Sequence, residues 1–170
     1  MVCLGDIVMK RIIVICCLFL ILTGCKSGQN YELQLAREVA QEIMDAVMEK
    51  DEELLFSLLS QNQQNYHKIS EQIQEAFDFI DGEIISYELP TNTLGGGKVL
   101  ENGKVISENI RIDIKNVETN SGKKYHIIIQ YFLIFKEDIN VEGIRLIRIN
   151  LIDDSSKIVD NVTIGYNPSD

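Results

Sequence analysis

Apolar residues in the first half of the chain recur at helical spacing. Leu35, Val39, Ile43 and Val47 follow one another at intervals of four, with charged and polar side chains among the residues between them. An apolar stripe of this period is typical of an amphipathic helix that buries one face. The pattern predicts that helical structure begins near residue 34 and continues, with interruptions, to about residue 81.

Two shorter helices are expected after the charged run 49–53 interrupts this stripe. Asp51 is suited to cap the second helix, because its carboxylate can accept hydrogen bonds from the first free backbone N–H groups. The buried face of that helix would consist of Leu54, Leu55, Leu58 and Leu59. After a polar loop at 60–65, a third helix would bury Ile69, Ile73, Phe77 and Ile80 and end at Gly82, in a left-handed conformation.

From Glu83 onward the apolar period shortens to that of strands. The pair Asn102-Gly103 between apolar residues predicts a tight hairpin. The segment 124–135 is apolar on both faces, which is typical of a central strand. A further strand over 144–152 changes the phase of its alternation at Leu146-Ile147, which indicates a bulge, and 159–164 could add an edge strand.

The two faces of the 124–135 strand receive different assignments. The odd face, expected against helix residues Leu35, Val39, Ile43, Ile73 and Phe77, consists of Tyr125, Ile127, Ile129, Tyr131, Leu133 and Phe135. The even face consists of His126, Ile128, Gln130, Phe132 and Ile134. Since the three helices are committed to the odd face, we expect the even face to be an exposed, partly apolar interaction surface centred on Phe132.

Helices followed by a meander of strands indicate an α+β fold, with the N-terminal helices packed on one face of a curved antiparallel sheet. A chain of 170 residues with 45% hydrophobic content suits one globular domain. We place that domain at residues 34–165.

The N-terminus has the pattern of a targeting segment. Lys10 and Arg11 precede an apolar run, 12–22, which is shorter than the roughly 20 residues of a membrane-spanning helix. We interpret residues 1–24 as a signal peptide whose true start is Met1 or Met9. All four cysteines lie within the first 25 residues, so the body after Cys25 cannot form an internal disulfide.

The run Leu22-Thr23-Gly24-Cys25 resembles the lipobox of bacterial lipoproteins. The resemblance implies cleavage before Cys25 and attachment of a diacylglycerol to its thiol. Residues 25–33 would then be a short tether on the extracytoplasmic face of the cell membrane. Two or more acyl chains hold a protein firmly at a membrane, whereas one chain holds it weakly. Whether an inner or an outer membrane holds the anchor stays open.

The body resembles an uncharacterised family of small bacterial lipoproteins, domain-of-unknown-function family 5104, with an NTF2-like or cystatin-like cone. The residues that carry the resemblance are the run 50–54, the stretch 77–82, Gly96-Gly97-Lys98, the turn 119–125 and Gly143-Ile144. The resemblance implies a fold and a location, and the family brings no assigned activity.

Charge and motifs exclude several functions. A formal net charge of −10 repels nucleic acid, so no nucleic-acid partner is expected. The run Gly95-Gly96-Gly97-Lys98 lacks the spacing and the following hydroxyl residue of a phosphate-binding loop. With only His67 and His126 and no cysteine in the body, we expect no metal site and no cofactor.

Two functional classes remain. The preferred one is a non-catalytic envelope domain that binds a protein partner or a small ligand, or associates with itself. The alternative is an envelope hydrolase or isomerase that uses a pocket inside the cone, where Tyr87, Tyr125, Tyr131 and Asp78 are the candidate polar groups. Asp78 and Asp81 could couple as carboxylates, but Asp81 at a helix end is more typical of a solvated side chain, as is His67 in a polar loop.

Overall fold

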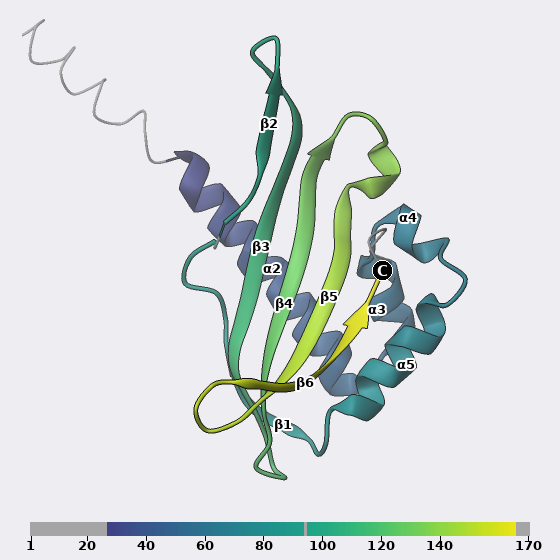
Figure 1. Ribbon diagram of the computed structural model, residues 1–170, viewed down its shortest axis with the longest axis vertical. Coiled ribbons are helices and arrows are strands. Elements are labelled where there is room, and N and C mark those ends of the chain that lie inside the picture. The colour runs from purple at the N-terminus through teal and green to yellow at the C-terminus, as the bar shows by residue number, and fades with distance from the viewer. Residues whose placement is uncertain (1–26, 94, 166–170) are drawn as a thin grey trace, which may run out of the picture. The chain divides into compact units, whose positions relative to one another are not determined.

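The computed structural model describes residues 27–93 and 95–165 (Figure 1). The predicted signal peptide 1–24 and the lipidation site Cys25 lie outside the described residues. The chain divides into two units, one up to Glu32 and one from Leu33 onward, and the second contains every element discussed below except the first turns of one helix.

The N-terminal half is helical, as the apolar period predicts. Helix α2 (Ser27–Glu49) is followed by α3 (Glu52–Leu58), α4 (Gln61–Gln64) and α5 (Ile69–Phe79). Helix α2 begins at Ser27, so most of the segment assigned to a tether is helical. Asp51 caps α3 as expected, because its side chain accepts a hydrogen bond of 2.9 Å from the Leu54 N–H. The segment expected to be a polar loop contains the short helix α4.

The C-terminal half forms one antiparallel sheet. Its strands are β1 (Ile84–Glu88), β2 (Lys98–Glu101), β3 (Lys104–Thr119), β4 (Lys124–Phe135), β5 (Gly143–Ile152) and β6 (Ile158–Ile164), with a short 3-10 turn, η1 (Ile139–Val141), before β5. The strand order is β1-β3-β4-β5-β6. Strand β2 also pairs with β3, along a different part of that strand from β1. Strand β4 is therefore central, as its apolar faces predict (Figure 1).

Turn chemistry sets the register of the sheet. Asn102 and Gly103 connect β2 to β3 with φ angles of 50° and 75°, the left-handed pair that a tight hairpin requires. Gly82, with φ of 86°, ends the helical half where it was predicted to. The bulge expected at Leu146-Ile147 lies one residue earlier, because Arg145 has no partner between the pairs Gln130–Leu146 and Tyr131–Ile144.

The helices cover one face of the sheet, and the core lies between the two layers (Figure 1). Side chains with no exposed surface on the sheet side include Ile112, Ile114, Ile127, Ile129, Ile147 and Ile149, and on the helix side Ile43, Met44, Leu55 and Ile73. The predicted packing of Tyr125, Ile127 and Ile129 against the helices is confirmed. The fold is thus α+β, with an open antiparallel sheet. The opposite face of the sheet is called the outer face below.

Candidate functional site

The four residues predicted to line an interior pocket are not gathered around one. Tyr125 is 1% exposed within the core, whereas Asp78 is exposed on α5. Tyr87 and Tyr131 are half-buried at the edge of the core. The hydroxyl of Tyr87 bonds the side-chain amide of Gln41 at 2.9 Å. The described hollows discussed below are lined by none of the four.

Tyr125 instead joins the end of α5 to the sheet. Its hydroxyl donates to the carbonyl of Phe79 at 3.2 Å and accepts from the N–H of Asp81 at 2.9 Å. Burial raises the pKa of this phenol above its ordinary value, and the nearby charge of Asp81 acts in the same direction. The contacts give Tyr125 a structural task, which is to satisfy backbone groups that the helix end leaves free.

The expectation that Phe132 is exposed is wrong. Its side chain is 6% exposed, because the guanidinium of Arg145 lies over the ring at 5.5 Å and the ring of Phe135 meets it edge-on at 5.6 Å. Two bulges produce this arrangement. Arg145 is the unpaired residue in β5, and Leu133 is unpaired in β4, so the alternation reverses and Phe135 lies beside Phe132 instead of against the helices.

The other side chains of the even face are half-buried and lie among polar side chains on the outer face. Cross-strand partners share a face of a sheet, so the register defines the neighbours on the outer face. One row runs Asp113, Ile128, Arg148, Thr163 from β3 to β6. The row on one side is Arg111, Gln130, Leu146, and the row on the other contains His126, Asn150, Asn161.

Asp113 lies at the centre of these polar side chains. Only 5% of its surface is exposed, although it is on the outer face. Its Oδ1 accepts from Nε and Nη2 of Arg111 at 3.1 and 3.0 Å and lies 3.2 Å from Nε2 of His126. Its Oδ2 is buried and has no hydrogen-bond partner among the described residues. A buried carboxylate needs such partners, so Arg111 and Asp113 hold each other in place.

His126 is the third member of this hydrogen-bonded group, and its ring is neutral. Burial lowers the pKa of His126, and the charge of Asp113 offsets this only in part. The ring is therefore neutral at pH 7, and Nε2 must carry the proton that bonds Asp113. The carbonyl of His126 accepts from the buried amide of Asn150 at 3.1 Å. Among the described residues, the hydrogen-bond partner of the ring is the Asp113 carboxylate and not a hydroxyl or thiol that the ring could activate as a nucleophile.

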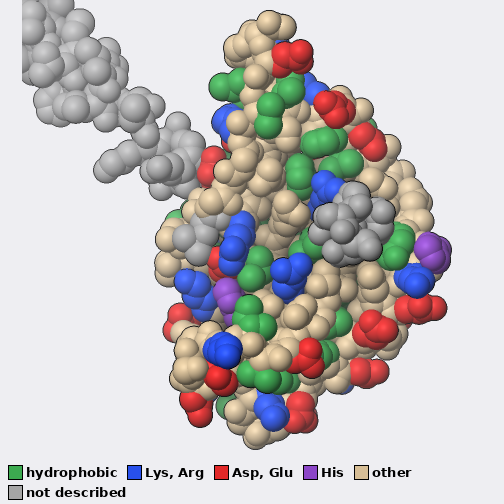
Figure 2. All heavy atoms as spheres, viewed as in Figure 1, with side chains coloured by type: hydrophobic (Ala, Val, Ile, Leu, Met, Phe, Trp, Pro, Cys, Tyr) green, Lys and Arg blue, Asp and Glu red, His purple; other side chains and the backbone are tan. Residues whose placement is uncertain are grey.

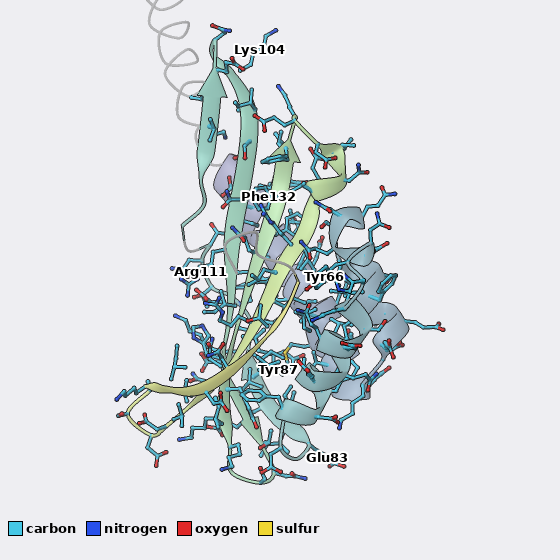
Figure 3. All side chains as sticks on the ribbon, turned by 45° about the vertical axis from the view of Figure 1, so that its right-hand side comes forward. Tyr66, Glu83, Tyr87, Lys104, Arg111 and Phe132 are labelled. Carbon is cyan, nitrogen blue, oxygen red and sulfur yellow. The ribbon has the colours of Figure 1, made fainter. Side chains whose placement is uncertain are left out.

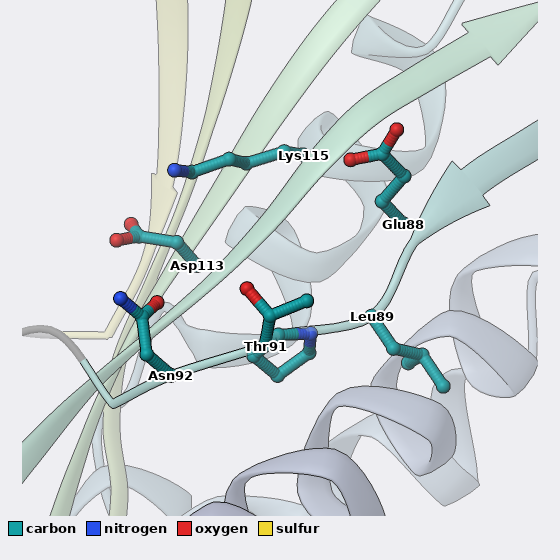
Figure 4. Close-up of a pocket in the computed structure, with 7 residues that line it drawn as sticks. Glu88, Leu89, Thr91, Asn92, Asp113 and Lys115 are labelled. Carbon is teal, nitrogen blue, oxygen red and sulfur yellow. The ribbon is translucent and has the colours of Figure 1, made fainter.

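The chain after β1 buries Asp113. Leu89 packs against the core and the Pro90 carbonyl accepts from Arg37 on α2, so this segment runs along the edge of the sheet beside β3. Residues 88–92 and Lys115 line a cavity of about 40 Å³ beside the carboxylate (Figure 4). Further along, the Asn109 N–H donates to the Gly97 carbonyl, and the Asn109 side-chain oxygen accepts from the Gly97 N–H. A Cβ on Gly96 would collide with the carbonyl of Asn109, so this close approach requires glycine.

Next to this close approach is a larger open concavity, which we call the outer hollow. Its volume is about 450 Å³, and it is lined by Gly95, Asn109, Arg111, Ile128, Ile129, Gln130, Leu146 and Arg148. Figure 3 shows Arg111 on the side of the sheet away from the helices. Ile128 and Leu146 supply apolar surface, and Gln130 and the two arginines supply polar groups.

Positive charge gathers at the outer hollow even though the chain is acidic. In the three rows defined above, together with the adjoining Lys115 on β3, the charged residues are Arg111, Arg148, Lys115 and Asp113. Lys and Arg side chains are visible across this face in Figure 2. Arg148 is exposed and forms no side-chain hydrogen bond or ion pair with the described residues. The site therefore has cationic donors that this part of the protein does not use.

The sequence analysis assigned His126 and Gln130 to this face but missed Arg111, Asp113 and Arg148. The alternation of 110, 112 and 114 with 111, 113 and 115 already placed the three charged residues of β3 on one face. What the alternation could not reveal is the register that sets them opposite His126 and Ile128, or the segment that buries Asp113.

Comparison with known protein families gives one match. The model of a family described as a domain of unknown function, DUF5104, matches residues 42–158. The chain belongs to this family. The matched part of the DUF5104 domain runs from within α2 to the start of β6 and includes every residue of the outer hollow. A search of curated proteins finds no match.

Two further observations concern residues 27–93 and 95–165 of the DUF5104 domain. Its described helices include none with the length and apolar character that crossing a membrane requires. In the same residues, no three His, Cys, Asp or Glu side chains are grouped as a metal site would need. What the arrangement offers is a polar surface with fixed donors, which can bind and orient a ligand.

Proposed function

We propose that this DUF5104 protein is a lipid-anchored, non-catalytic binding domain on the extracytoplasmic face of a bacterial cell membrane, and that it takes its ligand in the outer hollow. The location rests on the lipobox-like run 22–25 behind an apolar segment of signal-peptide length. An NTF2-like cone is consistent with the helices packed on one face of the sheet.

The binding proposal rests on the outer hollow and on Arg148, whose side chain has no hydrogen-bond or ion-pair partner among the described residues. Its volume of about 450 Å³ falls in the range of about 300–1,000 Å³ that is usual for small-molecule sites. Such sites combine apolar lining with a few placed polar groups, here Ile128 and Leu146 with Arg148 and Gln130. These residues replace Phe132, which the sequence pattern indicates as the contact residue, because the Phe132 side chain is buried.

A hydrolase or isomerase working inside the cone has less support. The inner face of the sheet is filled by isoleucines with no exposed surface, and the hydroxyl of Tyr125 is committed to backbone groups. Asp78 lies exposed on α5, away from the sheet side of the core.

The location is tested with Cys25→Ala. We expect the wild type to fractionate with membranes and to yield an N-terminal peptide that carries lipid on Cys25, whereas the variant keeps residues 1–24. Recovery of an unmodified Cys25 peptide from membrane-free medium would refute the anchor.

The binding site is tested by methyl NMR with a low-molecular-weight extract of the source cells. The methyl groups of Ile128 and Leu146 report on the outer hollow, and those of Ile127 and Ile149, which have no exposed surface and do not line the hollow, report on the core. We expect the extract to shift the first pair and to leave the second unchanged. Shifts confined to the helices or the core would contradict the proposed site.

A further inference from the structure

The outer hollow has a charge that indicates the class of its ligand. Arg111 is neutralised by Asp113, and Lys115 is the cross-strand partner of Glu88, but Arg148 has no acidic partner among the described residues. An unpaired guanidinium at a concave site attracts an anion and binds carboxylate or phosphate oxygens through two parallel hydrogen bonds.

Arg111 also keeps donors for a ligand. A guanidinium has five N–H groups, and Asp113 engages one on Nε and one on Nη2, which leaves three. Because Asp113 is buried and is itself bonded by His126, the plane of the Arg111 guanidinium is fixed before a ligand arrives. A donor held in place loses less conformational entropy on binding, so this contact becomes stronger. Asp113 and His126 are thus positioning residues for Arg111.

The two arginines stand diagonally across β4. Arg111 shares its row with Gln130, and Arg148 shares the neighbouring row with Ile128. A ligand that reaches both guanidinium groups must therefore lie over Ile128 and Gln130, with Leu146 beside it. The apolar pair offers surface to a hydrocarbon portion of the ligand, and the Gln130 amide can bond either a donor or an acceptor.

Larger anionic partners fit less well. The net charge of −10 repels a polyanion or an anionic membrane at long range, where single contacts do not act. A short-range attraction at one concavity favours a small molecule, which feels mainly the local charge.

We infer that the outer hollow binds a small organic anion, with a carboxylate or phosphate held between Arg111 and Arg148 and an apolar portion on Ile128 and Leu146. This inference rests on the proposed function and specifies the ligand of the same site. Carboxylate and phosphate oxygens match the same donors, so the probes in the experiment below distinguish between the two groups.

The test uses the full lipidated chain in nanodiscs of neutral phosphatidylcholine. Benzoate, phenyl phosphate, uncharged benzyl alcohol and inorganic phosphate are titrated while the methyl signals of Ile128 and Leu146 are followed. We expect benzoate or phenyl phosphate to bind at least tenfold more tightly than benzyl alcohol, because a hydrogen bond to a charged group contributes about tenfold or more in affinity. Inorganic phosphate should bind more weakly than phenyl phosphate, because it leaves the apolar pair uncovered.

Arg148→Gln should weaken binding of the anionic probe at least tenfold. The matched control is Lys157→Gln, which removes the same charge from the turn before β6, outside the outer hollow, and should leave the affinity within about twofold. Urea denaturation of both variants shows whether the fold is retained. Equal losses in the two variants would reduce the effect to net charge and overturn the inference.

The failures of the two proposals can be told apart. If benzyl alcohol binds as tightly as benzoate and phenyl phosphate, the anion inference is overturned while binding at the outer hollow stands. If the methyl signals respond only when the nanodisc contains anionic phosphatidylglycerol, the ligand is a lipid surface and the small-molecule inference is overturned. If neither the probes nor the cell extract shifts Ile128 or Leu146, both proposals fail.

Discussion

The hydroxyl of Tyr125 offers the sharpest test of how the helical layer is attached to the sheet. Tyr125→Phe removes one oxygen and keeps the ring, which packs edge-on against Phe79 at 5.9 Å. The change deletes two hydrogen bonds, one to the Phe79 carbonyl and one from the Asp81 N–H. Each such bond contributes about 0.5–1.5 kcal/mol net, so we expect the free energy of unfolding to fall by about 1–3 kcal/mol.

Equilibrium denaturation in urea measures this loss, with the slope of the transition used to check that the unfolded state is unchanged. Tyr87→Phe is the matched control, because among the described residues the Tyr87 hydroxyl bonds only the side-chain amide of Gln41, at the edge of the core. It should cost less than Tyr125→Phe, about 1 kcal/mol or below. If the two variants lost the same stability, the backbone bonds of Tyr125 would not be what holds the end of α5.

Three further predictions follow from the described contacts. Ile129→Ala should lower the free energy of unfolding by about 2–5 kcal/mol, because that side chain has no exposed surface, whereas Ile128→Ala on the outer face should cost clearly less in the same denaturation assay. Folding lowers the pKa of His126, so below a pH of about 6.5 the unfolded chain binds more protons than the folded one, and the free energy of unfolding should decline there. His126→Gln should remove part of that decline. The control His67→Gln, at an exposed loop position, should leave it in place. Gly82→Ala should cost more than Gly122→Ala in thermal unfolding, since both residues have positive φ but only at Gly82 would a Cβ meet the side chain of Asn120; equal costs would mean that conformational strain alone decides.

The fold could be predicted because its determinants are local. The four-residue spacing of Leu35 to Val47, the cap at Asp51 and the Asn102-Gly103 turn each act within a few positions of the chain, and each is found where the pattern put it. Helix α4 was not predicted, because its four polar residues have no apolar period from which a helix could be recognised.

The site could not be predicted to the same extent, because it depends on contacts between distant segments. Phe132 is buried by residues that reach it only because Leu133 and Arg145 are unpaired in their strands. The burial of Asp113 depends on residues 89–92, which follow β1 and run beside the strand that carries Asp113. Alternation assigns a residue to a face, but it does not indicate what else lies on that face.

The contact between α5 and β6 also determines when the protein can finish folding during its synthesis. The N–H of Gly165, after β6, donates to the side chain of Gln72 on α5 at 3.0 Å, across 93 positions of the chain. At about 5–20 residues per second, a ribosome needs roughly 5–20 seconds to make that interval, and until then the apolar face of α5 lacks its partner strand. During that interval the nascent chain exposes the apolar face of α5, so this helix has to wait for the last strand of the sheet, β6, to be made.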